Sequence, residues 1–202
     1  DITLAFIDEV AAGQRFVVAG TSYGGYLGRG VVHRRAEQMD GLLLTVPVIR
    51  ALFKERTLPP QVTLVEDLSL ASALEPDEKE GFLEIAVVQS RELLEGMRAD
   101  IFPARDVADQ AFLKRVSENY AFSFDVDALT APFAGPTLFL MGRQDWVCGY
   151  RDAWEILENY PRGTFAVLDR AGHVLEAEQR EISHALVSEW LDRVEEYVKS
   201  GE

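Results

Sequence analysis

The chain has little cysteine and no long hydrophobic run. A single cysteine, Cys148, excludes an internal disulfide framework and is typical of a reducing, cytoplasmic location. No stretch approaches the roughly 18 consecutive apolar residues of a membrane-spanning helix. The opening residues, DITLAFIDEVAAG, lack the basic and apolar regions of a signal peptide. These features favour a cytoplasmic protein.

Basic residues are also scarce. The chain has 20 Lys and Arg residues against 34 Asp and Glu residues, so its formal net charge is −14. Nucleic acid and membrane surfaces are therefore not expected partners, because binding them depends on cations that neutralise phosphates. A small neutral or cationic molecule is easier to accommodate. Nothing in the sequence indicates a metal ion or an organic cofactor.

Apolar strands and helical patterns alternate at both ends of the 202-residue chain. This alternation predicts right-handed crossovers and an α/β fold with a mostly parallel sheet flanked by helices. The first strand, RFVVAG, is expected to be buried on both faces because its residues do not alternate with polar ones. Strands are predicted at 15–20 and 41–47, a strand that ends in a polar loop over 135–145, and a strand followed by a loop over 163–173; helices are predicted at 3–12, 23–38, 149–161 and 177–199.

The middle of the chain has no convincing strand pattern. Three amphipathic helices with acidic outer faces are predicted over 65–75, 78–98 and 106–122. We interpret residues 58–131, called the insertion below, as a helical cap. It would interrupt a single core domain formed by residues 1–57 and 132–202.

The segment Gly20-Thr21-Ser22-Tyr23-Gly24 matches the pattern GxSxG between a strand and a helix. In such a sharp turn the serine hydroxyl is held in open space, and flanking glycines let the chain pass close to itself. The pattern predicts that Ser22 is a nucleophile. The alternative is a tight turn in which Ser22 caps the following helix.

A serine nucleophile needs a general base and a group that orients the base. Of the three histidines, His33 and His184 lie within predicted helices, whereas His173 lies in the loop after the last strand. Asp145 ends the preceding strand, and Asp169 and Asp152 are less suitably placed. Since ligands bind beyond the carboxyl ends of parallel strands, we predict Ser22, Asp145 and His173 as catalytic residues.

With this order of Ser22, Asp145 and His173, and with the segments GTSYGG, GRQD and AGH, the chain resembles the α/β-hydrolase superfamily over essentially its whole length. The resemblance implies that Ser22 attacks an acyl carbon, that His173 transfers the proton and that Asp145 orients His173. It also implies that the backbone N–H of Tyr23 is one oxyanion donor.

The chain departs from the family pattern before Phe16. Family members have further strands there, and a loop among them supplies the second oxyanion donor, which has no counterpart in this chain. We therefore expect a separate N-terminal segment to complete the sheet. Without it, the first strand would be an exposed apolar edge. A homo-oligomer is a further alternative.

The substrate predicted from the sequence is a small apolar ester, lactone or related acyl compound, with Trp146 and Val174 beside it. One alternative is a carbon–carbon bond hydrolase of ring-fission products, although such enzymes usually have an aromatic residue at the position of Val174. Another is a ligand sensor without turnover. A third is a peptidase similar to proline iminopeptidase, which would bind a substrate ammonium through acidic residues of the insertion. The candidates are Glu66, Asp67, Glu75, Asp77 and Glu78.

Overall fold

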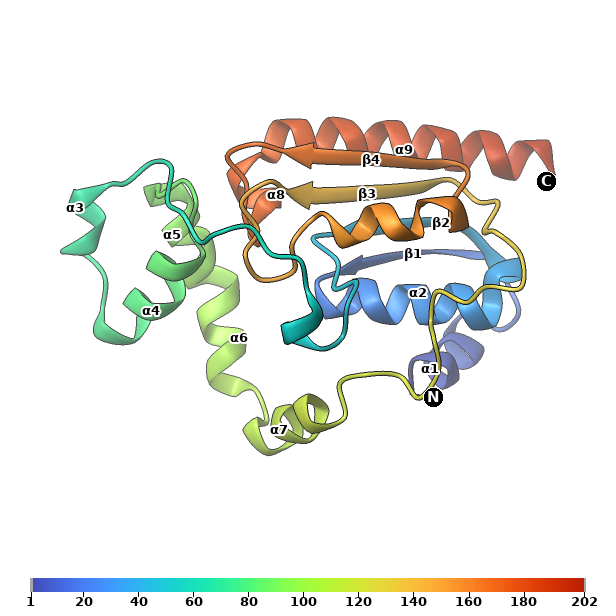
Figure 1. Cartoon of the computed structure of the whole chain (residues 1–202), viewed down its shortest axis with the longest axis horizontal. Coiled ribbons are helices and arrows are strands. Elements are labelled where there is room, and N and C mark those ends of the chain that lie inside the picture. Colours follow the sequence, from blue (N-terminus) through green and yellow to red (C-terminus); the bar gives the residue numbers. More distant parts are fainter. Residues whose placement is uncertain (1, 202) are drawn as a thin grey trace.

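The computed structural model describes residues 2–201, apart from the side chains of Ala71, Asp77 and Glu80. Four parallel strands form one sheet in the order β1-β2-β3-β4 (Figure 1). This architecture confirms the predicted α/β fold. The strands are β1 (Phe16–Thr21), β2 (Met39–Thr45), β3 (Thr137–Gly142) and β4 (Gly163–Leu168).

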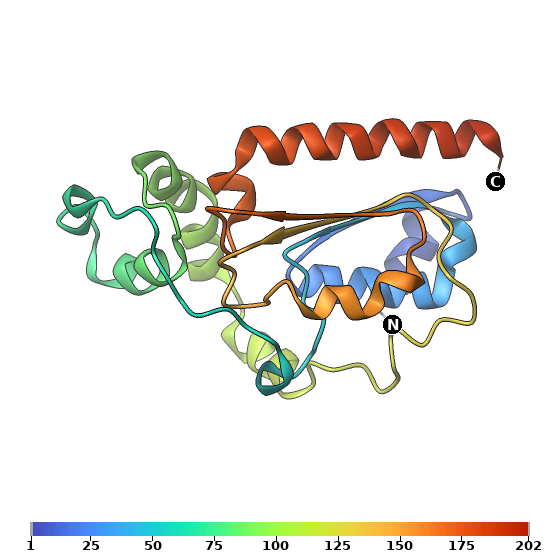
Figure 2. The same ribbon diagram turned by 45° about the horizontal axis from the view of Figure 1, so that its top comes forward.

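Helices cover both faces of the sheet (Figure 2). On one face lie α2 (Tyr23–Arg35) and the 3-10 helix η4 (Asp152–Asn159), and on the other lies α9 (Arg180–Ser200). The helix predicted over 149–161 is thus a shorter 3-10 helix. The closing helix predicted over 177–199 is interrupted at Gln179, which separates α8 (Leu175–Glu178) from α9. The remaining short helices of the core are α1 (Ile2–Val10), η1 (Ala36–Gln38) and η2 (Phe53–Glu55).

Two apolar clusters attach these helices to the sheet. Met39, Leu42 and Leu44 of β2 pack with residues of α2 and η4 on one face. On the other face, Leu43 packs with Trp190 and other residues of α9. Both faces of the central strands are therefore buried, as expected for a parallel sheet between helical layers. No helix among the described residues is long and apolar enough to cross a membrane.

Strand β1 differs from its prediction. Its residues alternate between half-buried and exposed positions, and Val17 keeps 43% of its surface exposed. Within residues 2–201, β1 pairs only with β2. The prediction that the strand is buried on both faces is wrong for the described residues, because α2 covers one face of β1 while α9 packs mainly against β2 and β3 and leaves the other face open.

The insertion is largely helical: its residues 68–107 lie beyond the carboxyl ends of the strands, and the chain after residue 118 runs back along α2 (Figure 1). The predicted helix over 78–98 is interrupted where Ala86 to Gln89 are extended and Val88 forms a parallel bridge with Val65. Val87 and Val88 favour this extended backbone because both are β-branched. The helices are α3 (Leu68–Ala71), α4 (Pro76–Ile85), α5 (Arg91–Gly96), the π-helical turn η3 (Met97–Ile101), α6 (Phe102–Val107) and α7 (Gln110–Glu118).

A buried arginine joins α2 to the loop after β2. The side chain of Arg29 is fully buried and donates hydrogen bonds to the carbonyls of Val48 and Ile49. It also forms a two-point ion pair with Asp127, with both N–O distances at 2.8 Å. The carboxylate thus compensates the buried guanidinium, and the pair fixes the chain that leads from the insertion back to β3.

Candidate active site

Ser22 stands at the junction of β1 and α2 in a strained backbone conformation, with φ 54° and ψ −118°. Its backbone N–H donates to the carbonyl of Thr45, and its carbonyl accepts from the N–H groups of Gly25 and Val48, each at 3.0 Å. The hydroxyl makes no capping hydrogen bond to α2. The helix-capping alternative for Ser22 is therefore wrong, and the hydroxyl is available for other partners.

The glycines around Ser22 have unequal roles. A Cβ atom on Gly20 would lie 2.4 Å from the carbonyl oxygen of Gly24, and one on Gly25 would lie 2.7 Å from Cβ of Pro47. A Cβ atom on Gly24 would meet no atom within 4 Å. Among the described residues, the close approach therefore requires Gly20 and Gly25, rather than the Gly20 and Gly24 of the sequence pattern.

The three predicted catalytic side chains form one hydrogen-bonded chain. Nε2 of His173 lies 3.0 Å from Oγ of Ser22, and Nδ1 of His173 lies 3.2 Å from Oδ2 of Asp145. Three loops at the carboxyl ends of β1, β3 and β4 supply these residues, as the parallel sheet requires. The arrangement can transfer a proton from the serine hydroxyl to the imidazole.

Backbone groups fix the carboxylate of Asp145. Its side chain is fully buried, and Oδ1 accepts hydrogen bonds from the N–H groups of Val147 at 2.9 Å and Cys148 at 3.1 Å. The other oxygen remains directed at His173. The loop after β3 therefore orients the carboxylate, which in turn orients the imidazole ring.

The surroundings of His173 favour its charged form. Burial alone would lower the pKa of His173, but the hydrogen bond with Asp145 and the nearby Cys148 outweigh this effect and raise the pKa above its ordinary 6.5. Cys148 is buried, and its Sγ lies 3.9 Å from Oγ of Ser22. An imidazolium formed by proton transfer is thus stabilised by the adjacent carboxylate.

Three residues that were weaker candidates for the catalytic base or its orienting acid, His33, Asp169 and Asp152, lie elsewhere. The ring of His33 packs against that of Phe124 at 4.7 Å between centroids. Asp169 accepts a hydrogen bond from Gln144, and Asp152 accepts one from the backbone of Thr57. None of these contacts reaches Ser22 or His173.

Asp145, Cys148 and His173 are also the one group within the described residues whose side chains could jointly hold a metal ion, with potential ligand atoms within 4.8 Å of one another. Two of the three already bind each other through the hydrogen bond of the catalytic arrangement. We therefore assign no metal to them.

Tyr23 is the first residue of α2, so its N–H has no acceptor within the helix. This position suits the predicted oxyanion donor. The side chain points elsewhere: its hydroxyl donates to the carbonyl of Tyr120, and the two rings pack with centroids 4.2 Å apart. Tyr23 thus also connects α2 to the chain that follows α7.

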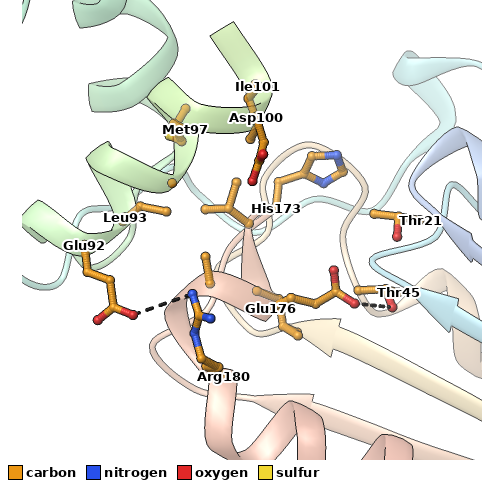
Figure 3. Close-up of a pocket in the computed structure, with 14 residues that line it drawn as sticks. Thr21, Thr45, Glu92, Leu93, Met97, Asp100, Ile101, His173, Glu176 and Arg180 are labelled. Carbon is orange, nitrogen blue, oxygen red and sulfur yellow. Dashed lines mark hydrogen bonds and ion pairs between the residues drawn. The ribbon is translucent and has the colours of Figure 1, made fainter. Parts of the chain in front are cut away.

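A cavity of about 320 Å³ opens beside His173 between the insertion and the core (Figure 3). Asp100 extends into it from η3, and Glu176 extends into it from α8, where its carboxylate accepts a hydrogen bond from Thr45. Arg180 also lines the cavity and forms an ion pair with Glu92 at 3.5 Å. Asp100 and Glu176 could not be recognised from the sequence as residues of this cavity, because both belong to otherwise ordinary acidic helices.

The two residues predicted to contact the substrate, Val174 and Trp146, lie in different surroundings in the structure. Val174 lines the cavity, next to Leu93 and Met97 of the insertion. Trp146 is not among the lining residues, and its indole N–H donates to the carbonyl of Glu84 at 2.9 Å. Trp146 therefore joins the loop after β3 to the end of α4.

Four of the acidic residues proposed to bind an ammonium group do not line this cavity: Glu66, Asp67, Glu75 and Glu78. Asp67 caps α3, and Glu78 pairs with Arg98 at 2.6 Å, which lowers the pKa of Glu78 to about 2. The side chain of Asp77 lies outside the described part of the chain. The carboxylates of the cavity, Asp100 and Glu176, are better placed for such a role.

Comparison with known proteins identifies the family. The family described as serine aminopeptidase, S33, matches residues 1–180. The chain belongs to this α/β-hydrolase family. As an S33 family member it is a serine hydrolase, in agreement with the order of Ser22, Asp145 and His173. A comparison with curated proteins found no match.

Solved structures of α/β hydrolases share the fold of this S33 family member. An α/β superfamily hydrolase from Oenococcus oeni PSU-1 is 27% identical, with a TM-score of 0.86 over 96% of this chain and 72% of its own. A meta-cleavage product hydrolase from Pseudomonas fluorescens IP01 is 19% identical, with a TM-score of 0.61 over 94% of this chain and 69% of its own. A thermophilic esterase is 18% identical, with a TM-score of 0.62 over 94% of this chain and 70% of its own.

Proposed function

We propose that this protein hydrolyses a small ester, lactone or related acyl compound through an acyl-enzyme on Ser22. The observation that carries the proposal is the continuous hydrogen-bonded chain from Ser22 through His173 to Asp145. A hydroxyl is a weak nucleophile at neutral pH, and only a base within hydrogen-bond reach makes it effective. No metal or organic cofactor enters this reaction.

The steps follow from the geometry. Oγ of Ser22 attacks the acyl carbon while Nε2 of His173 accepts the hydroxyl proton, and Asp145 stabilises the resulting imidazolium. The N–H of Tyr23 donates to the oxyanion of the tetrahedral intermediate. Collapse of the intermediate releases the alcohol, which takes the proton from His173. Water then attacks the acyl-enzyme, and His173 accepts a proton from the water and returns it to Ser22.

The charge of the cavity supports an ester over a ring-fission product. Asp100 and Glu176 place two carboxylates in the cavity beside His173, and the cation there, Arg180, pairs with Glu92. A dienoate substrate carries its own carboxylate and would be repelled. Neutral acyl groups, bound against Leu93, Met97 and Val174, fit better. We propose the insertion as the cap that forms this wall of the cavity.

The same charges favour one second candidate, an acyl compound with a free ammonium group, as in an aminoacyl or peptide substrate. In the first candidate, the carboxylates of Asp100 and Glu176 repel anionic substrates. In the second, they also bind the ammonium group of the substrate. Initial rates with p-nitrophenyl butyrate, with mono-p-nitrophenyl glutarate and with an aminoacyl p-nitroanilide separate them. We expect the neutral ester to be turned over and the anionic ester to be poor. A preference for the anionic ester would contradict this account of the cavity.

Fluorophosphonate labelling followed by peptide mapping tests the mechanism directly. We expect one modified residue, Ser22, and no labelling of Ser22→Ala. Modification of another residue would contradict the proposal. Burst kinetics then distinguish a hydrolase from a ligand sensor: many equivalents of p-nitrophenol per chain indicate turnover, whereas release that stops at about one equivalent indicates a sensor.

We also propose that a further polypeptide segment pairs with the free edge of β1. Val17 of that strand and Phe6 and Val10 of α1 are exposed apolar residues, and unpaired strand edges promote association. Such a segment would be the place for the second oxyanion donor. The test is the intact mass and native size of the active protein from its natural source. A monomer of 22.6 kDa with full esterase activity would contradict it, and so would a dimer of this chain alone.

A further inference from the structure

A carboxylate next to the active site joins two segments that are distant in the sequence. Glu178, the last residue of α8, accepts a hydrogen bond on Oε2 from the N–H of Gly172 at 2.6 Å. Its Oε1 accepts from the N–H groups of Val87 at 2.6 Å and Val88 at 3.1 Å. One side chain therefore satisfies three backbone donors, one in the His173 loop and two in the extended part of the insertion.

The two segments lie too close together for a side chain to separate them. A Cβ atom on Gly172 would lie 2.7 Å from Cγ2 of Val87 and 3.2 Å from the carbonyl oxygen of Ile85. Gly172 and Val87 are both buried. Without the carboxylate, the N–H groups of Gly172, Val87 and Val88 would lose these partners. A buried N–H group without a partner destabilises the folded state.

Gly172 directly precedes His173, whose ring makes hydrogen bonds in two directions, to Ser22 and to Asp145. The position of the ring therefore depends on the backbone of the residue before it. A displacement of about 1 Å at a catalytic group can lower the reaction rate by about 10²-fold. The contact with Glu178 is the one that fixes the N–H of Gly172.

We infer that Glu178 is a positioning residue: through its hydrogen bonds to Gly172, Val87 and Val88, it couples the placement of His173 to the docking of the insertion on the core. The inference rests on the proposed function, since it concerns the histidine of that mechanism. Glu178 does not touch Ser22 or the reacting atoms. It acts by keeping the imidazole within reach of both partners and by keeping the wall of the cavity in place.

The experiment compares Glu178→Gln with Glu178→Asp and with Glu181→Gln. Glutamine has nearly the shape of glutamate, but its single acceptor oxygen cannot serve both segments, and its amide N–H₂ faces a donor. Aspartate keeps the charge and is one methylene shorter, so it reaches one segment well and the other poorly. Glu181 lies exposed in the first turn of α9 and provides the matched control.

Two readouts are measured on each folded variant: the rate constant of fluorophosphonate labelling at Ser22 and the low-field proton resonance of the His173–Asp145 hydrogen bond. For Glu178→Gln we expect labelling to slow by about 10²-fold and the resonance to be lost or broadened. Glu178→Asp should be intermediate, and Glu181→Gln should match the wild type. A Glu178→Gln protein that melts earlier but labels at the wild-type rate with an unchanged resonance would overturn the inference.

Failure of the proposed function gives a different result. If the wild type itself is not labelled, the Ser22 mechanism fails, and the proton resonance still tests Glu178. Its loss in Glu178→Gln and retention in Glu181→Gln would support the positioning role, whereas its retention in both would overturn it. If Glu178→Gln does not fold, the same comparison is made with Glu178→Asp.

Discussion

The sulfur of Cys148 lies 3.9 Å from the hydroxyl oxygen of Ser22, so two potential nucleophiles stand beside one imidazole. Their partners differ. Ser22 is 3.0 Å from Nε2 of His173 and occupies the strained junction between β1 and α2. Cys148 is almost completely buried in the loop after β3. The geometry therefore assigns the nucleophile to Ser22 and a packing role to Cys148.

Replacing each candidate nucleophile tests that assignment. Ser22→Ala should lower kcat with p-nitrophenyl butyrate by at least about 10⁴-fold, since the acyl-enzyme can no longer form. Cys148→Ala should keep most of the activity and should still be labelled at Ser22. A Cys148→Ala protein as inactive as Ser22→Ala, yet folded by circular dichroism, would refute the assignment.

The pH dependence of activity follows from the raised pKa of His173. The imidazole must be neutral to accept the serine proton, so kcat/KM should rise with pH, with a midpoint above 6.5. In Asp145→Asn the carboxylate that raises the pKa is removed, so the midpoint should move to lower pH while kcat falls by about 10⁴-fold. The check is a pH–rate profile of both proteins. An unchanged midpoint in Asp145→Asn would mean that another group controls the acid limb.

The glycines near Ser22 should respond differently to alanine. Gly20→Ala places a Cβ atom 2.4 Å from the carbonyl oxygen of Gly24 and should lower the free energy of unfolding by about 1–3 kcal/mol. Gly24→Ala meets no atom within 4 Å and lies in α2, so it should be neutral or stabilising by about 0.5–1 kcal/mol. Urea unfolding measures both. Equal losses in the two variants would show that the clash does not decide stability.

The Arg29–Asp127 ion pair should be important for stability. In Asp127→Ala the buried guanidinium loses its compensating carboxylate, so the free energy of unfolding should fall by about 3–5 kcal/mol. Asp106→Ala removes an exposed partner of Arg105 and should have a much smaller effect. Denaturant unfolding of both variants provides the comparison. A loss in Asp127→Ala no larger than in Asp106→Ala would contradict the structural role.

The hydrogen-bonded chain of Ser22, His173 and Asp145 could be predicted from the sequence because each member follows the end of a strand. Parallel topology brings all such ends to one edge of the sheet, so the positions of Ser22, Asp145 and His173 at three strand ends predicted that their side chains lie close together. The two-sided burial of β1 could not be predicted correctly, because an apolar strand looks the same in the sequence whether it is central or at an edge. The location of an edge is a property of the whole sheet.

The contacts of the insertion could not be predicted from the sequence either. An amphipathic pattern continues through Ala86 to Gln89, although the chain there is extended and bridges to Val65. Glu178 looks like any acidic residue of a helix. Its role depends on which backbone N–H groups remain without partners once the insertion meets the loop of Gly172, and only the folded structure defines that set.

The π-helical turn η3 has a consequence for how the cavity can vary. A π-helical turn contains one residue more than an α-helical turn, so the residues that follow are rotated by about 100° relative to an uninterrupted α-helix. In this arrangement Asp100 and Ile101 line the cavity, while Phe102 packs among the buried residues of the insertion. Deletion of a single residue within Met97–Ile101 would convert this turn to an α-helical one, and the residues on either side would keep their faces. A change in the length of this turn would therefore alter the lining of the cavity locally, without rotating the helix that follows.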